Sequence, residues 1–471
     1  MSPTSPAKDG DVGDIVGSPA RYLAKKKPAG DRTSQELATL ALVRLAATDL
    51  DATVNLLNTT WQNGLRPELA AWAWATVGKR AALALDPAAP TYYQQADLLA
   101  TKTERDIVWG EETMAWKARA ALRNSSGPRW QQVMQAINAM DTREQRDPTW
   151  VYWKARALQA LSRDSTEAGG MASQAQEMLQ SIAGQYHFYG SLAAEDLGLP
   201  ITMPAVPAPV TATEREAAKN DAALQRALLL IGAGLRNEGN REWNFALRGL
   251  DDRALRAAAE QGCERALWDR CINTSDRTKA EVDMAQRFPT PFRRELTAKA
   301  RDASLDPAYV YGLIRQESRF IMDARSGVGA AGLMQLMPAT ARWTAKKIGM
   351  SFTPDMITDR DTNLKLGMAY LKLIQDDLGG SQAMAAAAYN AGPNRPRRWR
   401  EGPKLEPAIW VENVPFSETR DYVKKVLSNA TFYSALLADP NATTAPSLKA
   451  RLGRSIGPRE PGQPVPDGDL P

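Results

Sequence analysis

The stretch DPAYVYGLIRQESRFI, residues 306–321, predicts an amphipathic α-helix that carries a glutamate in its apolar stripe. Asp306 is a good N-cap, and Pro307 suits the first helical position. Glu317 lies at i+7 of a stripe whose apolar members, at i, i+3, i+4 and i+11, are Val310, Leu313, Ile314 and Ile321. A carboxyl group on the core side is partly desolvated, which raises its pKa towards neutrality, as a general acid requires. A solvent-exposed surface charge is the alternative.

A glycine-rich stretch, SGVGAAGLMQLMP at 326–338, follows this helix. Three glycines within six residues allow the backbone to approach a ligand closely, and we expect a helix after Pro338. A phosphate-binding loop is disfavoured because there is no Gly-Lys-Ser/Thr and no preceding strand. Met334 and Gln335 are either ordinary core and surface residues or the lining of a groove for an N-acetylated sugar.

Two later stretches complete a possible site. AMAAAAYNAGP at 383–393 predicts a helix of small residues that ends at glycine and proline, with Tyr389 and Asn390 at its C-terminal end. These two residues are also consistent with a plain helix cap. VENVPFSETRDY at 411–422 leads from a loop into an amphipathic helix that extends to about Leu437. Glu412 is a second candidate carboxylate.

The chain upstream of these stretches reads as stacked helices. Residues 34–200 are rich in Ala, Leu, Trp and Arg, and the string WKARA occurs at 116–120 and again 37 residues later at 153–157. A helical repeat of this length predicts an α-solenoid, with unrelated alanine-rich helices as the alternative. Several prolines between 200 and 209 interrupt the pattern before a second helical block at 213–285. No strand alternation is visible, so the predicted class is all-α.

The composition excludes several kinds of site. The 471 residues carry a net charge of +5 with mixed signs, which does not suggest a nucleic-acid binder. His187 is the one histidine, and Cys263 and Cys271 are the two cysteines, so metal sites with several such ligands are nearly excluded. His187 lies in an aromatic run, where packing is favoured over catalysis. The two cysteines are roughly 12 Å apart along a straight helix, too far to bridge, whereas a turn between them would allow a disulfide.

The sequence contains no targeting or membrane signal that can be recognised. No stretch approaches 18 consecutive apolar residues, so we expect no membrane span. The first residues, MSPTSPAKDGDVGD, lack the charged and apolar regions of a signal peptide. Taken alone, these observations favour the cytoplasm.

Residues 290–437 closely resemble the catalytic domain of the soluble lytic transglycosylases of Gram-negative bacteria. Four motifs carry the resemblance in the same order: QES at 316–318, GLMQ at 332–335, AYNAG at 388–392 and VPFSETRDYV at 414–423. The resemblance implies a lysozyme-like fold, close to goose-type lysozyme. Upstream, YHFYG, LGLP and REWNF at 186–190, 197–200 and 241–245 resemble the superhelical and linker domains of the family.

The resemblance implies a domain organisation and a compartment. We expect a flexible segment, an α-superhelical domain, a helical linker domain, a lysozyme-like catalytic domain and a disordered tail, at 1–33, 34–209, 213–288, 290–440 and 441–471. Family members usually carry a secretion signal and more helix pairs before the segment that resembles GDIVGSPA at 13–20. We therefore expect a truncated superhelix, a misplaced start or a fragment, and a protein of the periplasm.

The activity that the resemblance implies is cleavage of the β-1,4 bond between N-acetylmuramic acid and N-acetylglucosamine in peptidoglycan, with formation of 1,6-anhydromuramoyl ends. Ordinary glycosidases use two carboxylates, whereas Glu317 alone would serve as acid and base here. It would protonate the glycosidic oxygen and then deprotonate the muramoyl O6 hydroxyl, an intramolecular nucleophile of high effective molarity. A hydrolytic goose-type muramidase and a non-catalytic cell-wall scaffold are the alternatives.

The resemblance also assigns roles to the other candidates. Tyr389 would hydrogen-bond and orient Glu317, and Ser318 would contact substrate or support the loop. Met334, Gln335 and Asn390 would shape the sugar subsites, and Glu412 would lie in the groove. No metal or organic cofactor is implied. The expected partners are peptidoglycan glycan strands and, as a further possibility, proteins of cell-wall synthesis or division.

Overall fold

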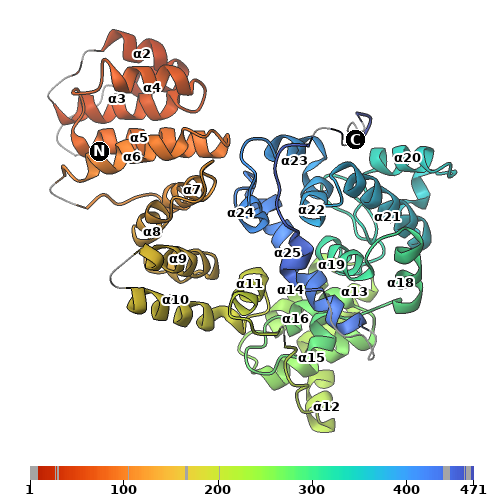
Figure 1. The fold of residues 1–471 in the computed structure, drawn as a ribbon. Coiled ribbons are helices and arrows are strands. Elements are labelled where there is room, and N and C mark those ends of the chain that lie inside the picture. The colour runs from red at the N-terminus through yellow and green to blue at the C-terminus, as the bar shows by residue number, and fades with distance from the viewer. Residues whose placement is uncertain are drawn as a thin grey trace. The chain divides into compact units, whose positions relative to one another are not determined.

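The computed structural model describes residues 9–26, 28, 31–103, 106–164, 168–200, 202–438, 446–460, 462 and 468–471. These residues form helices joined by short loops, and among them the β-type pairings are only isolated bridges, such as Arg325 with Ala331. The predicted all-α class is confirmed. The chain divides into two compact units, and neither of them is continuous in sequence. Figure 1 labels many of their helices.

Unit 1 comprises Met1–Gln185, Trp399–Arg420 and Arg454–Glu460. Its helices pack mainly against their neighbours in sequence, for example α5 on α6 and α9 on α10, as a solenoid requires. They are α1 (Asp9–Gly17), α2 (Pro19–Lys25), α3 (Arg32–Leu45), α4 (Leu50–Asn58), α5 (Pro67–Leu83), α6 (Ala89–Ala100), α7 (Glu111–Leu122), α8 (Trp130–Asn138), η1 (Glu144–Arg146), α9 (Pro148–Leu161), η2 (Ser162–Asp164), α10 (Ala168–Ala183) and α24 (Pro407–Glu412).

The repeated string WKARA places one arginine on α7 and its equivalent on α9, and both bind the segment 399–420. The guanidinium of Arg119 forms a buried ion pair with Glu412, at 2.9 Å. Arg156 forms a bidentate pair with Glu406, in which both N–O distances are 3.0 Å. The solenoid repeat therefore provides two charged contacts for a segment that lies much later in the chain, with separations of 250 and 293 residues.

Unit 2 comprises Tyr186–Arg398, Asp421–Gly453 and Pro461–Pro471. Helices α23 and α25 cross from one unit into the other along the chain. Its helices are α11 (Phe188–Asp196), α12 (Ala212–Asn220), α13 (Ala222–Gly232), α14 (Arg236–Ala246), α15 (Asp252–Glu264), α16 (Trp268–Ser275), α17 (Met284–Arg287), α18 (Arg293–Asp302), α19 (Pro307–Glu317), α20 (Pro338–Lys347), η3 (Pro354–Thr358), α21 (Arg360–Asp377), α22 (Gln382–Ala391), α23 (Asn394–Trp399), α25 (Ser417–Leu437) and α26 (Leu448–Leu452).

The two cysteines form a disulfide in unit 2. Cys263 is in α15, Cys271 is in α16, and the turn between these helices brings their Cα atoms to 4.9 Å. Ala266 in this turn has a φ of 55°, in the left-handed region that reverses the chain direction. The sequence left open either one straight helix through both cysteines or a turn between them. The structure has the turn, because α15 ends before Cys271 and the chain reverses direction.

Both chain ends contain more helix than the sequence predicts. Residues 1–8 and 439–445, and most of 461–467, lie outside the described residues. Within the expected flexible segment 1–33, however, α1 and α2 are formed, and within the expected disordered tail 441–471, α26 is formed. α26 is ordered because Leu448 and Leu452 are buried and Arg451 pairs with Asp306 at 2.5 Å. No helix in the described part of the chain is both long and apolar enough to cross a membrane.

Candidate active site

Glu317 is the last residue of α19, in unit 2. The helix begins as predicted, since the side chain of Asp306 accepts a hydrogen bond from the backbone N–H of Ala308 and Pro307 occupies the first turn. The predicted stripe is wrong at its far end, because the helix stops before Ile321. The two residues before it, Arg319 and Phe320, have positive φ angles of 47° and 63°.

Ser318 explains why the helix ends at this point. Its buried hydroxyl donates to the backbone O of Leu333 at 2.8 Å and accepts from the backbone N–H of Phe320 at 3.1 Å. A serine side chain that binds local backbone groups competes with helical hydrogen bonding. Ser318 thus joins the end of α19 to the glycine-rich loop and leaves Glu317, which is half-buried, at the junction.

Close packing fixes the helix that carries Glu317. Gly312 faces α25, and a Cβ atom at this position would lie 2.7 Å from the backbone O of Val426. On another side, the hydroxyl of Tyr309 donates to the backbone O of Gln382, at the start of α22, at 2.8 Å. α19 is therefore held between α22 and α25, which both contribute side chains near Glu317.

Tyr422, in α25, hydrogen-bonds Glu317. Its hydroxyl donates to Oε1 of Glu317 at 2.5 Å. Burial raises the pKa of Tyr422 well above its ordinary value, and the nearby Glu317 carboxylate raises it further, so the phenol stays protonated as a donor. Sequence reasoning missed this role, although Tyr422 belongs to a motif that it had singled out. The signal was the tyrosine of the motif at 414–423, which alone does not specify a partner.

Tyr389 has a different partner from the one expected. It lies near the end of α22, where its hydroxyl donates to the backbone O of Met334 at 2.8 Å. Burial is the main cause that raises its pKa well above the ordinary value, and the charge of Glu317 adds to the shift. The charge of Glu317 therefore acts on Tyr389, while the hydrogen bond of Tyr389 stabilises the glycine-rich loop.

The glycine-rich loop is built around Asn363, a fully buried residue of α21 that sequence reasoning also missed. Its side-chain oxygen accepts from the N–H of Met334 at 2.8 Å, and its Nδ2 donates to the carbonyls of Ala331 and Ile357 at 3.0 and 2.7 Å. A Cβ atom on Gly332, whose φ is 80°, would lie 2.2 Å from Nδ2 of Asn363. The loop therefore requires glycine both for its backbone conformation and for this close approach.

We expect Gly332→Ala to lower the stability of the protein by roughly 2–4 kcal/mol, because left-handed strain and overpacking both oppose alanine there. Gly329→Ala is the matched control. Gly329 also has a positive φ, of 94°, but a Cβ atom on it would meet nothing within 4 Å. Denaturant midpoints measured by circular dichroism check the prediction. Equal shifts for the two variants would show that the contact with Asn363 is unimportant.

The remaining candidates divide between the two units. Met334 is fully buried, and Gln335, with a φ of 47°, donates its amide to the carbonyls of Ala324 and Gly332 at 3.1 and 2.9 Å. Asn390 is half-buried in the last turn of α22. Glu412 belongs to unit 1, where it is fully buried against Arg119.

Two further features bear on the type of chemistry. The described residues contain no group of three or more His, Cys, Asp or Glu side chains arranged to hold a metal ion. His187 caps α11, because its Nδ1 accepts from the N–H of Gly190 at 3.0 Å, which agrees with the structural role favoured from sequence. In unit 2, Glu317 accepts a hydrogen bond from the buried Tyr422, an arrangement that suits acid–base chemistry.

Comparison with known families defines the class first. Residues 296–408, which include Glu317 and the glycine-rich loop, match the family of the transglycosylase SLT domain. Residues 413–441, which include Tyr422, match the soluble lytic transglycosylase helical domain. Glu317 and the glycine-rich loop thus lie in a segment similar to the transglycosylase SLT domain, and Tyr422 lies in the segment that follows it.

Comparison with individual proteins extends this result to most of the chain. The soluble lytic murein transglycosylase of Escherichia coli K12 is 27% identical over 88% of this chain and 66% of its own length. That of Salmonella typhimurium is 30% identical over 63% of this chain and 45% of its own. A crystal structure of an inactive mutant of lytic transglycosylase Slt from Pseudomonas aeruginosa superposes with a TM-score of 0.77 and 29% identity, over 95% of this chain and 70% of that one. Over most of its length the chain is thus similar to soluble lytic transglycosylases, as the four motifs predict, and it spans less than two thirds of the length of the two relatives from Escherichia coli and Salmonella typhimurium.

Proposed function

We propose that this protein is a peptidoglycan lytic transglycosylase that cleaves the β-1,4 bond between N-acetylmuramic acid and N-acetylglucosamine and forms 1,6-anhydromuramoyl ends. The observation that carries the proposal is the hydrogen bond from Tyr422 to Glu317, which links the segment that matches the soluble lytic transglycosylase helical domain to the segment that matches the SLT domain. Relatives that share this domain are named soluble lytic murein transglycosylases. The periplasm, where peptidoglycan lies, is the compartment that this activity requires.

Glu317 supplies both proton transfers in this proposal. As a carboxylic acid it protonates the glycosidic oxygen that leaves, and the bond between this oxygen and C1 of the muramoyl sugar breaks. As a carboxylate it then takes the proton of the O6 hydroxyl of the same sugar, and O6 forms the new bond to C1. The nucleophile is part of the substrate, so its effective molarity is high enough to compete with water.

Tyr422 and the loop position this chemistry. The phenol of Tyr422 fixes the orientation of the carboxyl group through Oε1 and compensates the charge of its ionised form. Ser318, Tyr389 and Asn363 bond the glycine-rich loop to the end of α19, to α22 and to α21, respectively. We assign Gln335 and Asn390 to the sugar subsites and Met334 to the support of the loop, because its side chain is fully buried. Glu412 supports unit 1 through Arg119.

Digestion of purified murein sacculi, followed by mass spectrometry of the muropeptides, tests the proposed function. A transglycosylase releases products that are lighter than hydrolytic ones by one water, and the Glu317→Gln variant releases none. Hydrated products from the wild type would identify a muramidase instead. Absence of products from a folded wild-type protein, together with an unchanged cellular effect of Glu317→Gln, would favour the scaffold.

Removal of the tyrosine donor tests the orientation of Glu317. We expect Tyr422→Phe to lower kcat by about tenfold to a hundredfold with little change in KM, since a hydrogen bond to a charged group contributes about 1.5–3 kcal/mol. Tyr433→Phe is the control, because Tyr433 is a buried tyrosine of the same helix whose hydroxyl donates to the backbone O of Pro289 at 3.0 Å. Steady-state rates on soluble glycan strands measure both variants. An unchanged kcat in Tyr422→Phe would remove Tyr422 from the positioning machinery.

A further inference from the structure

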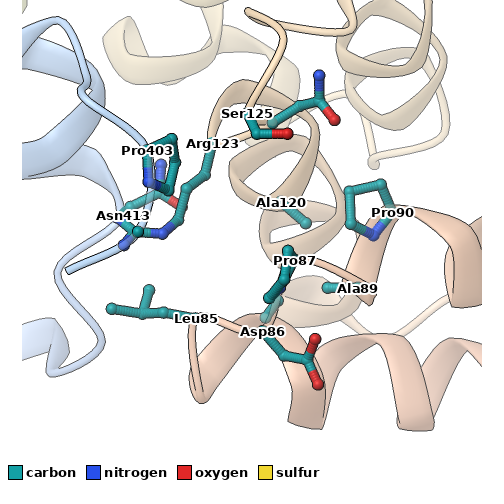
Figure 2. Close-up of a pocket in the computed structure, with 13 residues that line it drawn as sticks. Leu85, Asp86, Pro87, Ala89, Pro90, Ala120, Arg123, Ser125, Pro403 and Asn413 are labelled. Atoms are coloured by element: carbon teal, nitrogen blue, oxygen red, sulfur yellow. The ribbon is translucent and has the colours of Figure 1, made fainter.

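Unit 1 contains a cavity of about 450 Å³, a size that suits a small-molecule ligand. It lies between the C-terminal ends of α5 and α7, the start of α6 and the segment 402–413 (Figure 2). Most of its wall is apolar and comes from leucine, alanine and proline side chains, including Leu85, Pro87, Pro90, Ala120 and Pro403. Among the described residues of the lining, Arg123 is the one with a cationic side chain.

Arg123 is buried without an acidic partner in the described part of the chain. Its side chain is 9% exposed, its Nη2 donates to the carbonyls of Trp399 and Glu401 at 3.4 and 2.5 Å, and its Nε has no hydrogen-bond partner there. No ion pair joins Arg123 to any described carboxylate. Burial lowers its pKa to about 10, the direction expected when a cation loses solvent without gaining an anion.

Two other arginines of unit 1 have acidic partners, unlike Arg123 in the described part of the chain, and the carboxylate of the cavity wall has a partner of its own. Arg119, one turn earlier on α7, is paired with Glu412, and Arg156 is paired with Glu406. The carboxylate in the cavity wall, Asp86, accepts a hydrogen bond from the N–H of Ala88 at 2.8 Å, and Figure 2 shows it directed away from Arg123. A buried cation that only carbonyls contact is costly, and an anionic ligand would compensate it.

We propose that this cavity binds a small ligand with a carboxylate group, which pairs with Arg123 while a compact body fills the apolar walls. A carboxylate fits better than the more highly charged phosphate, because the cavity wall contains one guanidinium group, that of Arg123, and also the acidic residue Asp86. Two sources have this chemistry: a sugar acid such as N-acetylmuramic acid, and the terminal carboxylate of a short peptide. Binding of a carboxylate does not depend on the proposed function, whereas a murein origin of the ligand does.

Calorimetric titration of the full chain tests the proposal with four probes. They are two acids, each with a neutral counterpart. N-acetylmuramic acid is paired with N-acetylglucosamine, which lacks the carboxylate. The dipeptide alanyl-alanine is paired with the same dipeptide carrying a C-terminal amide. We expect at least one acid to bind, and its neutral counterpart to bind at least tenfold more weakly, because charge-assisted hydrogen bonds are the strong ones. The acid that binds identifies the source. Equal binding of acids and neutral counterparts, or no binding of either acid at millimolar concentration, would overturn the proposal.

Variants assign the binding to this cavity. Arg123→Met is expected to weaken binding of the acid at least tenfold. Ala120→Leu fills the cavity, leaves Arg123 in place and is expected to weaken binding to the same extent. This second variant provides the test if Arg123→Met fails to fold. Arg80→Gln, an exposed arginine of α5 outside the lining, is the control and leaves binding unchanged. Binding that survives both cavity variants lies elsewhere and contradicts the proposal. If the protein binds a carboxylate but releases no products from sacculi, the proposal for the cavity stands and the proposed function is rejected.

Discussion

Glu317→Gln will lower kcat on murein glycan by about a thousandfold while leaving the affinity for glycan nearly unchanged. Glutamine has the shape of glutamate and still accepts the hydrogen bond of Tyr422 through its side-chain oxygen. It carries no proton that it can transfer, so both the protonation of the leaving oxygen and the deprotonation of O6 are lost. An effect on kcat without an effect on binding is what loss of transition-state stabilisation produces.

The measurement combines single-turnover rates on labelled glycan strands with the Kd of the same strands. Glu295→Gln is the control, because Glu295 is an exposed carboxylate on α18 of the same unit and pairs with Arg360 at the surface. This control is expected to keep wild-type rates. If Glu317→Gln retained a tenth of the activity, another group would have to be the acid.

Glu412→Gln will destabilise the protein by about 3–5 kcal/mol, the cost of leaving one member of a buried ion pair without its partner. Glu412 is fully buried and Arg119 is 8% exposed. Arg119 also lies over the rings of Trp116 and Trp150, at 5.0 and 5.2 Å, so it cannot turn to solvent without loss of these contacts. Chemical denaturation monitored by tryptophan fluorescence measures the change.

The repeat provides a matched control for this prediction. Glu406→Gln breaks the equivalent pair with Arg156, but Glu406 is 41% exposed, so we expect a loss of at most about 1 kcal/mol. The double variant Arg119→Met with Glu412→Leu should recover part of the stability, because it removes the unpaired charge together with the pair. A loss in Glu412→Gln as small as that in Glu406→Gln would mean that water reaches Arg119.

The family and the helical class were predictable because they depend on local patterns. The Asp306 cap, the helix after Pro338 and the helix that stops at Gly392 follow from backbone preferences of single residues, and all three are present. The helix end at Glu317 was predicted less well. The apolar spacing suggested that the helix continues to Ile321, whereas Ser318 ends it through a bond to Leu333, which no local pattern announces.

Glu317 could be identified as the candidate acid from the sequence, since its position on a capped amphipathic helix and its motif are both local. The groups that surround it depend on how distant helices pack. Tyr422 is 105 residues away in sequence and Asn363 bonds across the loop, so their roles depend on the packing of α25 and α21 against α19 and the loop. Glu412 gives the clearest case. The family resemblance implied a place in the groove for Glu412, and the structure shows this residue fully buried and paired with Arg119, 293 residues earlier. Residues far apart in the chain become partners because folding buries their polar groups together and removes water from them, which happens only in the folded molecule.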